Sequence, residues 1–171
     1  MPQQRSPNTG IGFTLVELLI VIGIIAILAA IIFVAVDPGR RFAEARDAQR
    51  WSESNAILNA ILKYTVDARG SLPATAVALD AVAASVQIIG ENGGAVACAA
   101  VPACASQTVV ATDCFVTGLD SDLVDEYLSS IPTDPQNGTD NDTRYYINRT
   151  ASGRLTVGSC SAEREAISVQ R

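Results

Sequence analysis

The side chains best suited to chemistry in this chain are carboxylates and thiols, because it contains no histidine. Without histidine, Ser-His-Asp and Cys-His groupings and histidine-ligated zinc sites cannot form. The sequence also lacks a P-loop, a GxGxxG pattern and a CxxC pair. Phosphate-cradling loops, dinucleotide-binding folds and ribbon-type metal sites therefore have no support, and the chain is not expected to be an enzyme.

The tightest cluster of oxygen ligands consists of Asp134, Asp140, Asn141 and Asp142. A divalent cation would relieve the repulsion among these carboxylates, which makes Asp134, Asp140 and Asp142 weak calcium candidates. The spacing of an EF-hand is absent, however, and these residue types also favour a polar, turn-forming loop. We therefore expect no cofactor and no metal, with calcium at this loop as the alternative.

The thiols are Cys98, Cys104, Cys114 and Cys160. A four-thiolate metal site is disfavoured because the spacings lack a close pair. Disulfides suit an exported domain with a small sheet, and buried free thiols are the alternative. Four cysteines allow three pairings, and the spacing is compatible with all of them. We prefer Cys98 with Cys104 and Cys114 with Cys160, because the second bridge would tie the C-terminal strand to the sheet.

One long apolar segment follows directly after Glu17, an acid with hydrophobic residues on both sides. Residues 18–36 read LLIVIGIIAILAAIIFVAV, 19 residues without a charge. As a helix they would cover about 28 Å, close to the roughly 30 Å hydrocarbon core of a bilayer. The run is longer than the core of a cleavable secretory signal and lacks a small-residue cleavage site after it. We expect a spanning helix, in which Glu17 needs a partner or must reach headgroups and water.

A second helical stretch should follow the apolar segment. Asp37-Pro38-Gly39 should kink the helix, since proline lacks the amide donor and glycine is a poor helix former. Apolar residues then recur at three- and four-residue spacing, which predicts an amphipathic helix packed on a head domain. They are Phe42, Ala45, Ala48, Trp51, Leu58, Ile61, Leu62 and Thr65. The helix should end near Gly70.

The remaining residues predict a small α+β head. Residues 108–111 and 114–116 have the composition of short strands, residues 123–128 that of a short helix or turn, and residues 144–148 and 154–157 that of a hairpin. The expected fold class is α+β. A long N-terminal helix, with a transmembrane half and an amphipathic half, would pack on a small antiparallel β-sheet head.

Residues 12–17, GFTLVE, lie between a short polar leader and the long apolar run. This motif resembles the class III signal of type IV pilins and of the pseudopilins of type II secretion. The resemblance implies that a prepilin peptidase cuts after Gly12 and that Phe13 becomes an N-methylated terminus. It also implies that Glu17 serves assembly by pairing with the Phe13 ammonium of a neighbouring subunit. In an apolar core such a pair would chiefly specify register, because desolvating both charges offsets much of their attraction.

Residues 127–138, YLSSIPTDPQNG, followed by Tyr145-Tyr146, bear a weaker resemblance. They are similar to the P-x-DP and Y-Y segment in the heads of major pseudopilins and short bacterial pilins. The two resemblances cover residues 11–70 strongly and 127–157 loosely. They imply a pilin-like chain with a leader at 1–12, a transmembrane or filament-core helix at 13–36, its amphipathic continuation at 37–70 and an exported globular head at 71–171.

The resemblance implies a structural subunit of a type IV pilus-like filament. Its expected partners are identical or related pilin subunits, a prepilin peptidase, an inner-membrane assembly platform and membrane lipid before assembly. The chain should be a single-pass membrane protein first and part of a cell-surface filament later. The arginines that follow the apolar run favour the opposite orientation, but the cysteines and the family topology place the head outside the cytoplasm.

Two alternatives stay open at this point. One is the major pseudopilin of a type II protein secretion system. The other is a membrane-anchored module that binds DNA or a surface, with contacts from Arg144, Tyr145, Tyr146, Arg149 and Arg154. Residues 71–143 contain ten acids and no lysine or arginine. Nucleic acid is therefore not an expected partner.

Overall fold

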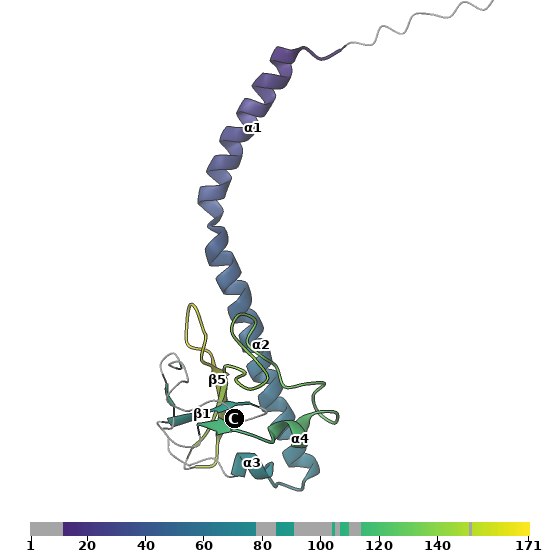
Figure 1. Cartoon of the computed structure of the whole chain (residues 1–171), viewed down its shortest axis with the longest axis vertical. Helices are drawn as coiled ribbons and strands as arrows, with labels where there is room; N and C mark the ends of the chain where they lie inside the picture. Colours follow the sequence, from purple (N-terminus) through teal and green to yellow (C-terminus); the bar gives the residue numbers. More distant parts are fainter. Residues whose placement is uncertain (1–11, 78–84, 91–103, 105–106, 110–113, 151) are drawn as a thin grey trace, which may run out of the picture. The chain divides into compact units, whose positions relative to one another are not determined.

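The computed structural model describes residues 12–77, 85–90, 104, 107–109, 114–150 and 152–171 (Figure 1). Its contacts divide the chain into two units, Met1–Arg41 and Phe42–Arg171. The first unit contains an apolar helix, and the second contains a helix and a sheet. The leader, filament-core and head boundaries expected from the sequence remain predictions.

The first unit is built around helix α1 (Leu15–Val36), which is 22 residues long. Its apolar window has a mean hydropathy of 3.4, and the helix is long and apolar enough to cross a membrane. Isoleucine and valine are only moderate helix formers in water, but in lipid a helix satisfies its own backbone hydrogen bonds. The apolar N-terminal helix expected from residues 18–36 is confirmed.

The helical path is interrupted at one residue, Asp37, before helix α2 (Pro38–Asp67) begins. Asp37 has a left-handed backbone with φ of 43°, and its side chain accepts a hydrogen bond from the Arg40 amide at 3.4 Å. Pro38 suits the first position of the new helix, where an amide hydrogen would have no partner in the preceding turn. The kink expected at Asp37-Pro38-Gly39 is thus a one-residue break.

In the second unit, α2 ends at Asp67 and is closed by Gly70, as predicted. Gly70 has φ of 95°, and its amide donates to the Thr65 carbonyl at 2.7 Å. Glycine adopts this left-handed conformation without a steric penalty, so the last turn satisfies one of its carbonyls. The short helices α3 (Ala74–Val77) and α4 (Leu119–Leu123) follow. Helix α4 precedes the segment predicted at 123–128 as a short helix or turn, where the structure has a turn at residues 125–127.

The sheet contains six strands within the described residues, in the order β2-β1-β4-β5-β6, with β3 also paired to β1. They are β1 (Ser85–Ile89), β2 (Thr108–Val109), β3 (Phe115–Val116), β4 (Tyr145–Arg149), β5 (Leu155–Ser159) and β6 (Ser168–Gln170). The hairpin predicted around residues 144–157 is confirmed as β4 and β5, which pair antiparallel. The small antiparallel sheet expected from the sequence is instead a mixed sheet, because β1 runs parallel to β2 and β3.

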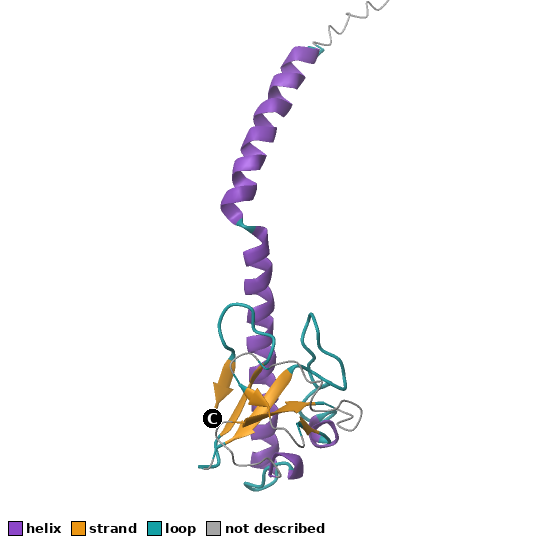
Figure 2. Cartoon of the chain, turned by 60° about the vertical axis from the view of Figure 1, so that its left-hand side comes forward, coloured by secondary structure: helices purple, strands orange, loops and turns teal. Residues whose placement is uncertain are grey.

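Strand β4 is buried on both of its faces. Tyr145 and Ile147 belong to a cluster with α2 residues such as Ile57, whereas Tyr146 belongs to a second cluster with Cys104 and Cys160. Figure 2 shows α2 running along one side of the strands. Because successive strand residues point to opposite faces, consecutive tyrosines can fill two separate cores. The α+β class is confirmed, with α2 on a mixed sheet.

The buried face of α2 differs from the predicted stripe. Leu58 and Ile61 are buried as expected, but Phe42 and Trp51 are 64% and 57% exposed. Arg50 is instead fully buried, one residue and about 100° around the helix from Trp51. A charged residue can occupy a core position only where polar partners meet it. The head supplies those partners, which the periodicity of α2 alone did not reveal.

Candidate functional site

The N-terminus of α1 is closed by a reciprocal pair of contacts between Thr14 and Glu17. The Glu17 amide donates to the Thr14 hydroxyl at 3.2 Å. The Glu17 Oε2 accepts from the Thr14 amide at 2.9 Å and from the Thr14 hydroxyl at 2.8 Å. This capping box satisfies two amide donors that the first helical turn leaves open. The predicted assembly residue therefore already has a partner within its own chain.

The predicted cleavage site lies just before this cap. Gly12 and Phe13 form no helix, and the Phe13 ring is 88% exposed. A side chain at Gly12 would find no atom within 4 Å, so the folded chain itself does not require glycine here. The requirement, if processing occurs as predicted, must come from the protease. Cleavage at Gly12 and methylation of Phe13 stay predictions.

The remainder of α1 presents apolar side chains in every direction. None of its residues is buried, and its only acidic residue in the first turn is Glu17. A helix that is hydrophobic all round is stable only when lipid or other helices cover it. The first unit thus combines one carboxylate at its N-terminal end with an uncovered apolar surface.

The second unit has a site that the sequence did not predict, and its centre is the buried side chain of Arg50. The guanidinium Nε donates to Asp134 Oδ2 at 2.6 Å, and Nη2 donates to Gln136 Oε1 at 2.9 Å. Nη1 donates to Asp47 at 2.9 Å and to Glu163 at 2.8 Å. Three carboxylates and one amide therefore surround one arginine, which is the kind of pairing that a buried charge requires.

Two further contacts extend this site, which we call the Arg50 cluster (Arg46, Asp47, Arg50, Asp134, Gln136 and Glu163). Arg46 binds Glu163 through two hydrogen bonds, each of 2.6 Å. Asp47 accepts from the backbone amides of Glu163 at 3.1 Å and Arg164 at 2.9 Å. The cluster consequently joins α2 to residues 134–137 and to residues 163–164, which are far apart in the sequence.

The electrostatics keep the Arg50 cluster ionised. Burial by itself would raise the pKa of Asp134, but hydrogen bonds from Arg50 and from the amides of Gln136 and Asn137 outweigh it and lower this pKa. Hydrogen bonds from Arg46 and Arg50 lower the pKa of Glu163 from 4.5 to about 2. Burial acts to lower the pKa of Arg50, but its carboxylate partners raise it overall. The ion pairs therefore persist throughout the neutral and mildly acidic range.

A neighbouring hydrogen bond extends the polar contacts one turn further along α2. The buried Tyr145 of β4 donates its hydroxyl hydrogen to Glu53. Burial, followed by this hydrogen bond, raises the pKa of Tyr145. The first residue of the predicted Tyr145-Tyr146 pair is thus a contact between the sheet and α2.

The calcium candidates do not come together as one set of ligands. The Asp134 carboxylate is directed at Arg50, and it also accepts from the amides of Gln136 and Asn137, each at 3.0 Å. Asp142 accepts from the Arg144 amide at 3.0 Å and pairs with its guanidinium at 3.8 Å. In the part of the chain that the structure describes, no group of three or more acidic or thiol side chains could hold a metal. The expected absence of a metal, with calcium at this loop as the alternative, stays a prediction.

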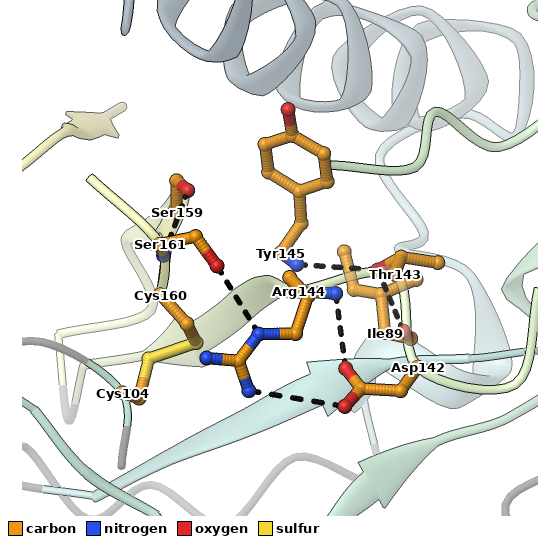
Figure 3. The surroundings of a disulfide bond; sticks show 9 residues. All are labelled: Ile89, Cys104, Asp142, Thr143, Arg144, Tyr145, Ser159, Cys160 and Ser161. Carbon is orange, nitrogen blue, oxygen red and sulfur yellow. Dashed lines mark hydrogen bonds and ion pairs between the residues drawn. A yellow bond between two sulfur atoms is a disulfide. The ribbon is translucent and has the colours of Figure 1, made fainter. Parts of the chain in front are cut away.

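The cysteine pairing differs from the one that we preferred. Cys104 and Cys160 form a disulfide with an S–S distance of 2.06 Å, shown in Figure 3. Cys114 is also disulfide-bonded, whereas Cys98 lies outside the described residues. The preferred pairs Cys98–Cys104 and Cys114–Cys160 are therefore wrong. Cys104, Cys114 and Cys160 all lie in the second core cluster, and within it the Cα atoms of Cys104 and Cys160 are 4.1 Å apart.

The residues assigned to a DNA-binding module are poorly placed for that role. Tyr145 and Tyr146 are buried in the two cores, and Arg144 is 7% exposed. Arg144 also donates from its Nε to the Ser161 hydroxyl at 3.2 Å (Figure 3). Three of the five contacts that this alternative needs are therefore inside the head rather than on its surface.

Comparison with known families supports the assignment of the N-terminal region. Residues 11–33 match the model of the prokaryotic N-terminal methylation motif. This match is consistent with a class III signal of type IV pilins and pseudopilins, as the GFTLVE motif predicted. No curated protein and no solved structure matches the chain significantly. The motif points to a structural protein that is processed by a prepilin peptidase and assembles with pilin subunits.

Proposed function

We propose that this chain is a structural subunit of a type IV pilus-like filament. A prepilin peptidase would cut between Gly12 and Phe13 and release Phe13 as a methylated N-terminus. The processed chain would wait in the membrane as a single-pass protein. An inner-membrane assembly platform would then add it to a cell-surface filament of identical or related subunits. The role is mechanical rather than enzymatic.

The observation that carries this proposal is the combination of features in α1. Its side chains are apolar in all directions and unburied, and its carboxylate lies in the first turn. A simple anchor needs only the apolar surface, because lipid covers it. It gains nothing from an ionisable group that is costly to place in hydrocarbon. A filament core gives both features a purpose, since neighbouring helices cover the apolar surface and a neighbouring ammonium meets the carboxylate.

The cap at the start of α1 is compatible with this second partner. Both hydrogen bonds that Glu17 accepts from Thr14 end on Oε2. A carboxylate has about four acceptor positions on its two oxygens, so Oε1 can receive a further donor. Processing at Phe13 would retain the Thr14 amide and hydroxyl. Glu17 can therefore cap its own helix and accept the Phe13 ammonium of a neighbour at the same time.

Two substitutions at Glu17 separate the cap from the charge pair. Glutamine serves in a capping box almost as well as glutamate, but it carries no charge to pair with an ammonium. Leucine removes both functions. If charge pairing drives assembly, Glu17→Gln and Glu17→Leu should both abolish fibres while the processed protein still accumulates in the membrane.

The test is electron microscopy of sheared surface material beside membrane immunoblots from cells that express the prepilin peptidase and assembly machinery. Normal fibres from Glu17→Gln together with none from Glu17→Leu would leave Glu17 with a capping role only. Normal fibres from both variants would exclude any assembly role for Glu17. Absence of fibres even from the unchanged chain would refute the filament proposal.

The pseudopilus of a type II secretion system is the second candidate. Residues 127–138 are similar to the corresponding segment of both major pseudopilins and short bacterial pilins, and their Asp134 binds α2 through Arg50, so this segment is compatible with both candidates. The two candidates share processing and assembly but differ in their partners. Loss of protein export after deletion of the chain would indicate the pseudopilus, and loss of surface fibres with normal export would indicate the pilus.

A further inference from the structure

The contacts between α2 and the rest of the second unit change in character along the helix. Starting from Phe42, Ala43 is buried, and the charged side chains Arg46, Asp47 and Arg50 then bind the head. Glu53 follows with its hydrogen bond from Tyr145. The buried apolar side chains Ile57, Leu58 and Ile61 come last. The ion pairs therefore precede the large apolar contacts on the side from which α2 is connected to α1.

The Arg50 cluster is a costly way to obtain stability alone. Arg50 and Asp134 are both fully buried as side chains, and removing two charges from water offsets much of their mutual attraction. Buried ion pairs can often be replaced by apolar residues without loss of equilibrium stability. An α2 core made only of residues like Ile57 would therefore hold the head equally well at rest. The cluster is therefore expected to have a function other than equilibrium stability, one that apolar contacts perform less well.

We propose that the Arg50 cluster is a mechanical joint that transmits tension from the N-terminal helix into the head. This inference rests on the proposed function, because extraction from the membrane and addition to a filament would pull on the chain before α2. Tension that enters at Phe42 reaches Arg46, Asp47 and Arg50 before it reaches Ile57. The cluster would then carry the load before the large apolar contacts do.

The geometry suits such a joint because the bonds share the load between three segments. Arg50 alone binds residues on α2, at 134–136 and at 163, and Arg46 doubles the connection to Glu163. Charge-assisted hydrogen bonds are short and directional, so a small displacement of α2 strains all of them together. Apolar contacts lose energy gradually as surfaces slide. Resistance to force depends on the unfolding rate rather than on equilibrium stability.

The test is single-molecule pulling on the full chain in a detergent micelle. Azide-bearing residues at Gly39 and Ser152 attach the handles, so the force acts between the start of α2 and the loop between β4 and β5. Glu163→Gln and Asp134→Asn weaken the cluster while keeping side-chain size. The matched control is Ile57→Val, and each comparison uses urea concentrations or temperatures at which the two proteins have equal equilibrium stability.

At equal stability and constant force, we expect α2 of Glu163→Gln to detach about tenfold faster than α2 of Ile57→Val. Helix α2 of Asp134→Asn should detach faster still. If Asp134→Asn does not fold, the comparison of Glu163→Gln with Ile57→Val is the test. Equal detachment rates for the cluster variants and the control would refute the proposal that the Arg50 cluster transmits tension. The measurement needs no filament, so a lack of fibres would count against the proposed function and not against the pulling result.

Discussion

Helices α1 and α2 follow one another in the chain, yet they treat apolar and charged side chains in opposite ways. Every residue of α1 is unburied although the helix is almost wholly apolar. Helix α2 buries the guanidinium of Arg50 while it leaves the indole of Trp51 more than half exposed. Each helix thus departs from the usual distribution of apolar groups inside and charges outside, α1 by exposing its apolar side chains and α2 by burying one charge.

The two departures have different explanations. The charges of α2 find their partners inside the same chain, as the bonds from Arg50 to Asp134 and Glu163 demonstrate. The apolar surface of α1 finds no such cover in the first unit, so its cover must be lipid or other helices. A change in the second unit should therefore alter a single chain, whereas a change in α1 should become visible only in the membrane or in a filament.

The largest expected effect is the loss of the Asp134 carboxylate. Asp134→Ala leaves the buried guanidinium of Arg50 short of its main partner, and breaking a buried pair in this way costs about 3–5 kcal/mol. Asp140→Ala removes an exposed acid from the same loop and should change stability by less than about 0.5 kcal/mol. Urea unfolding of the full chain in micelles, followed by circular dichroism, measures both. Equal midpoints for the two variants would contradict the description of the cluster.

Loss of the disulfide should come next. Cys104 and Cys160 are 56 residues apart in the sequence, so their bond closes a long loop and restricts the unfolded chain. Replacing both with serine should destabilise the head by about 2–5 kcal/mol. The same urea experiment gives the value, and peptide mapping without reductant checks the Cys104–Cys160 pair. Recovery of a Cys114–Cys160 peptide instead would show that the pairing is different.

Two glycine-to-alanine substitutions, one in each unit, should have smaller effects on stability. A methyl group at Gly158 would lie 2.3 Å from the Ile167 carbonyl and 2.5 Å from the Tyr146 hydroxyl. Gly158→Ala should therefore overpack the sheet and destabilise it by about 1–3 kcal/mol. Gly23 of α1 has no atom within 4 Å of that position, so Gly23→Ala should leave urea unfolding of the head unchanged. A similar loss of head stability in both variants would mean that α1 is part of the head.

The smallest expected effect is the loss of stability at acidic pH. The pKa of Glu163 falls from 4.5 to about 2 on folding, and that of Asp134 is also lowered. A lowered pKa contributes stability above the unfolded value, and this contribution is lost as the pH falls through the folded value. The urea midpoint should stay constant from pH 7 to 5 and fall between pH 4 and 2. Glu163→Gln should reduce that fall, and an unchanged acid response in this variant would contradict the assignment.

The features that the sequence could predict are those that depend on residues close together in the chain. The apolar helix, its break at Asp37 and its first-turn acid at Glu17 depend on neighbouring residues, and a pattern read along the chain was enough to predict them. The hairpin of β4 and β5 is also local, because its strands are separated by a short loop. These parts of the fold and of the N-terminal site were therefore predicted from sequence.

The missed features depend on residues that are distant in the sequence. Arg50 was not part of the predicted buried stripe, because its partner Asp134 lies 84 positions away. Strand β1 was missed because it lies in an alanine- and valine-rich stretch with little pattern of its own. The Cys104–Cys160 pair depends on which strands are neighbours, and cysteine spacing does not specify this. For the Arg50 cluster, one signal was available in the sequence. Arg50 lies at helical spacing from Ser54 and Ile57, which are also buried.

The central claim is that Phe13 begins the mature chain and that α1 forms the core of a filament. The most direct measurement is mass spectrometry of fibres sheared from cells that express the chain with a prepilin peptidase and assembly machinery. The account predicts a subunit that begins at Phe13, carries a methyl group on its amine and retains all of α1. A subunit that still begins at Met1, or one cut beyond Val36, would contradict it.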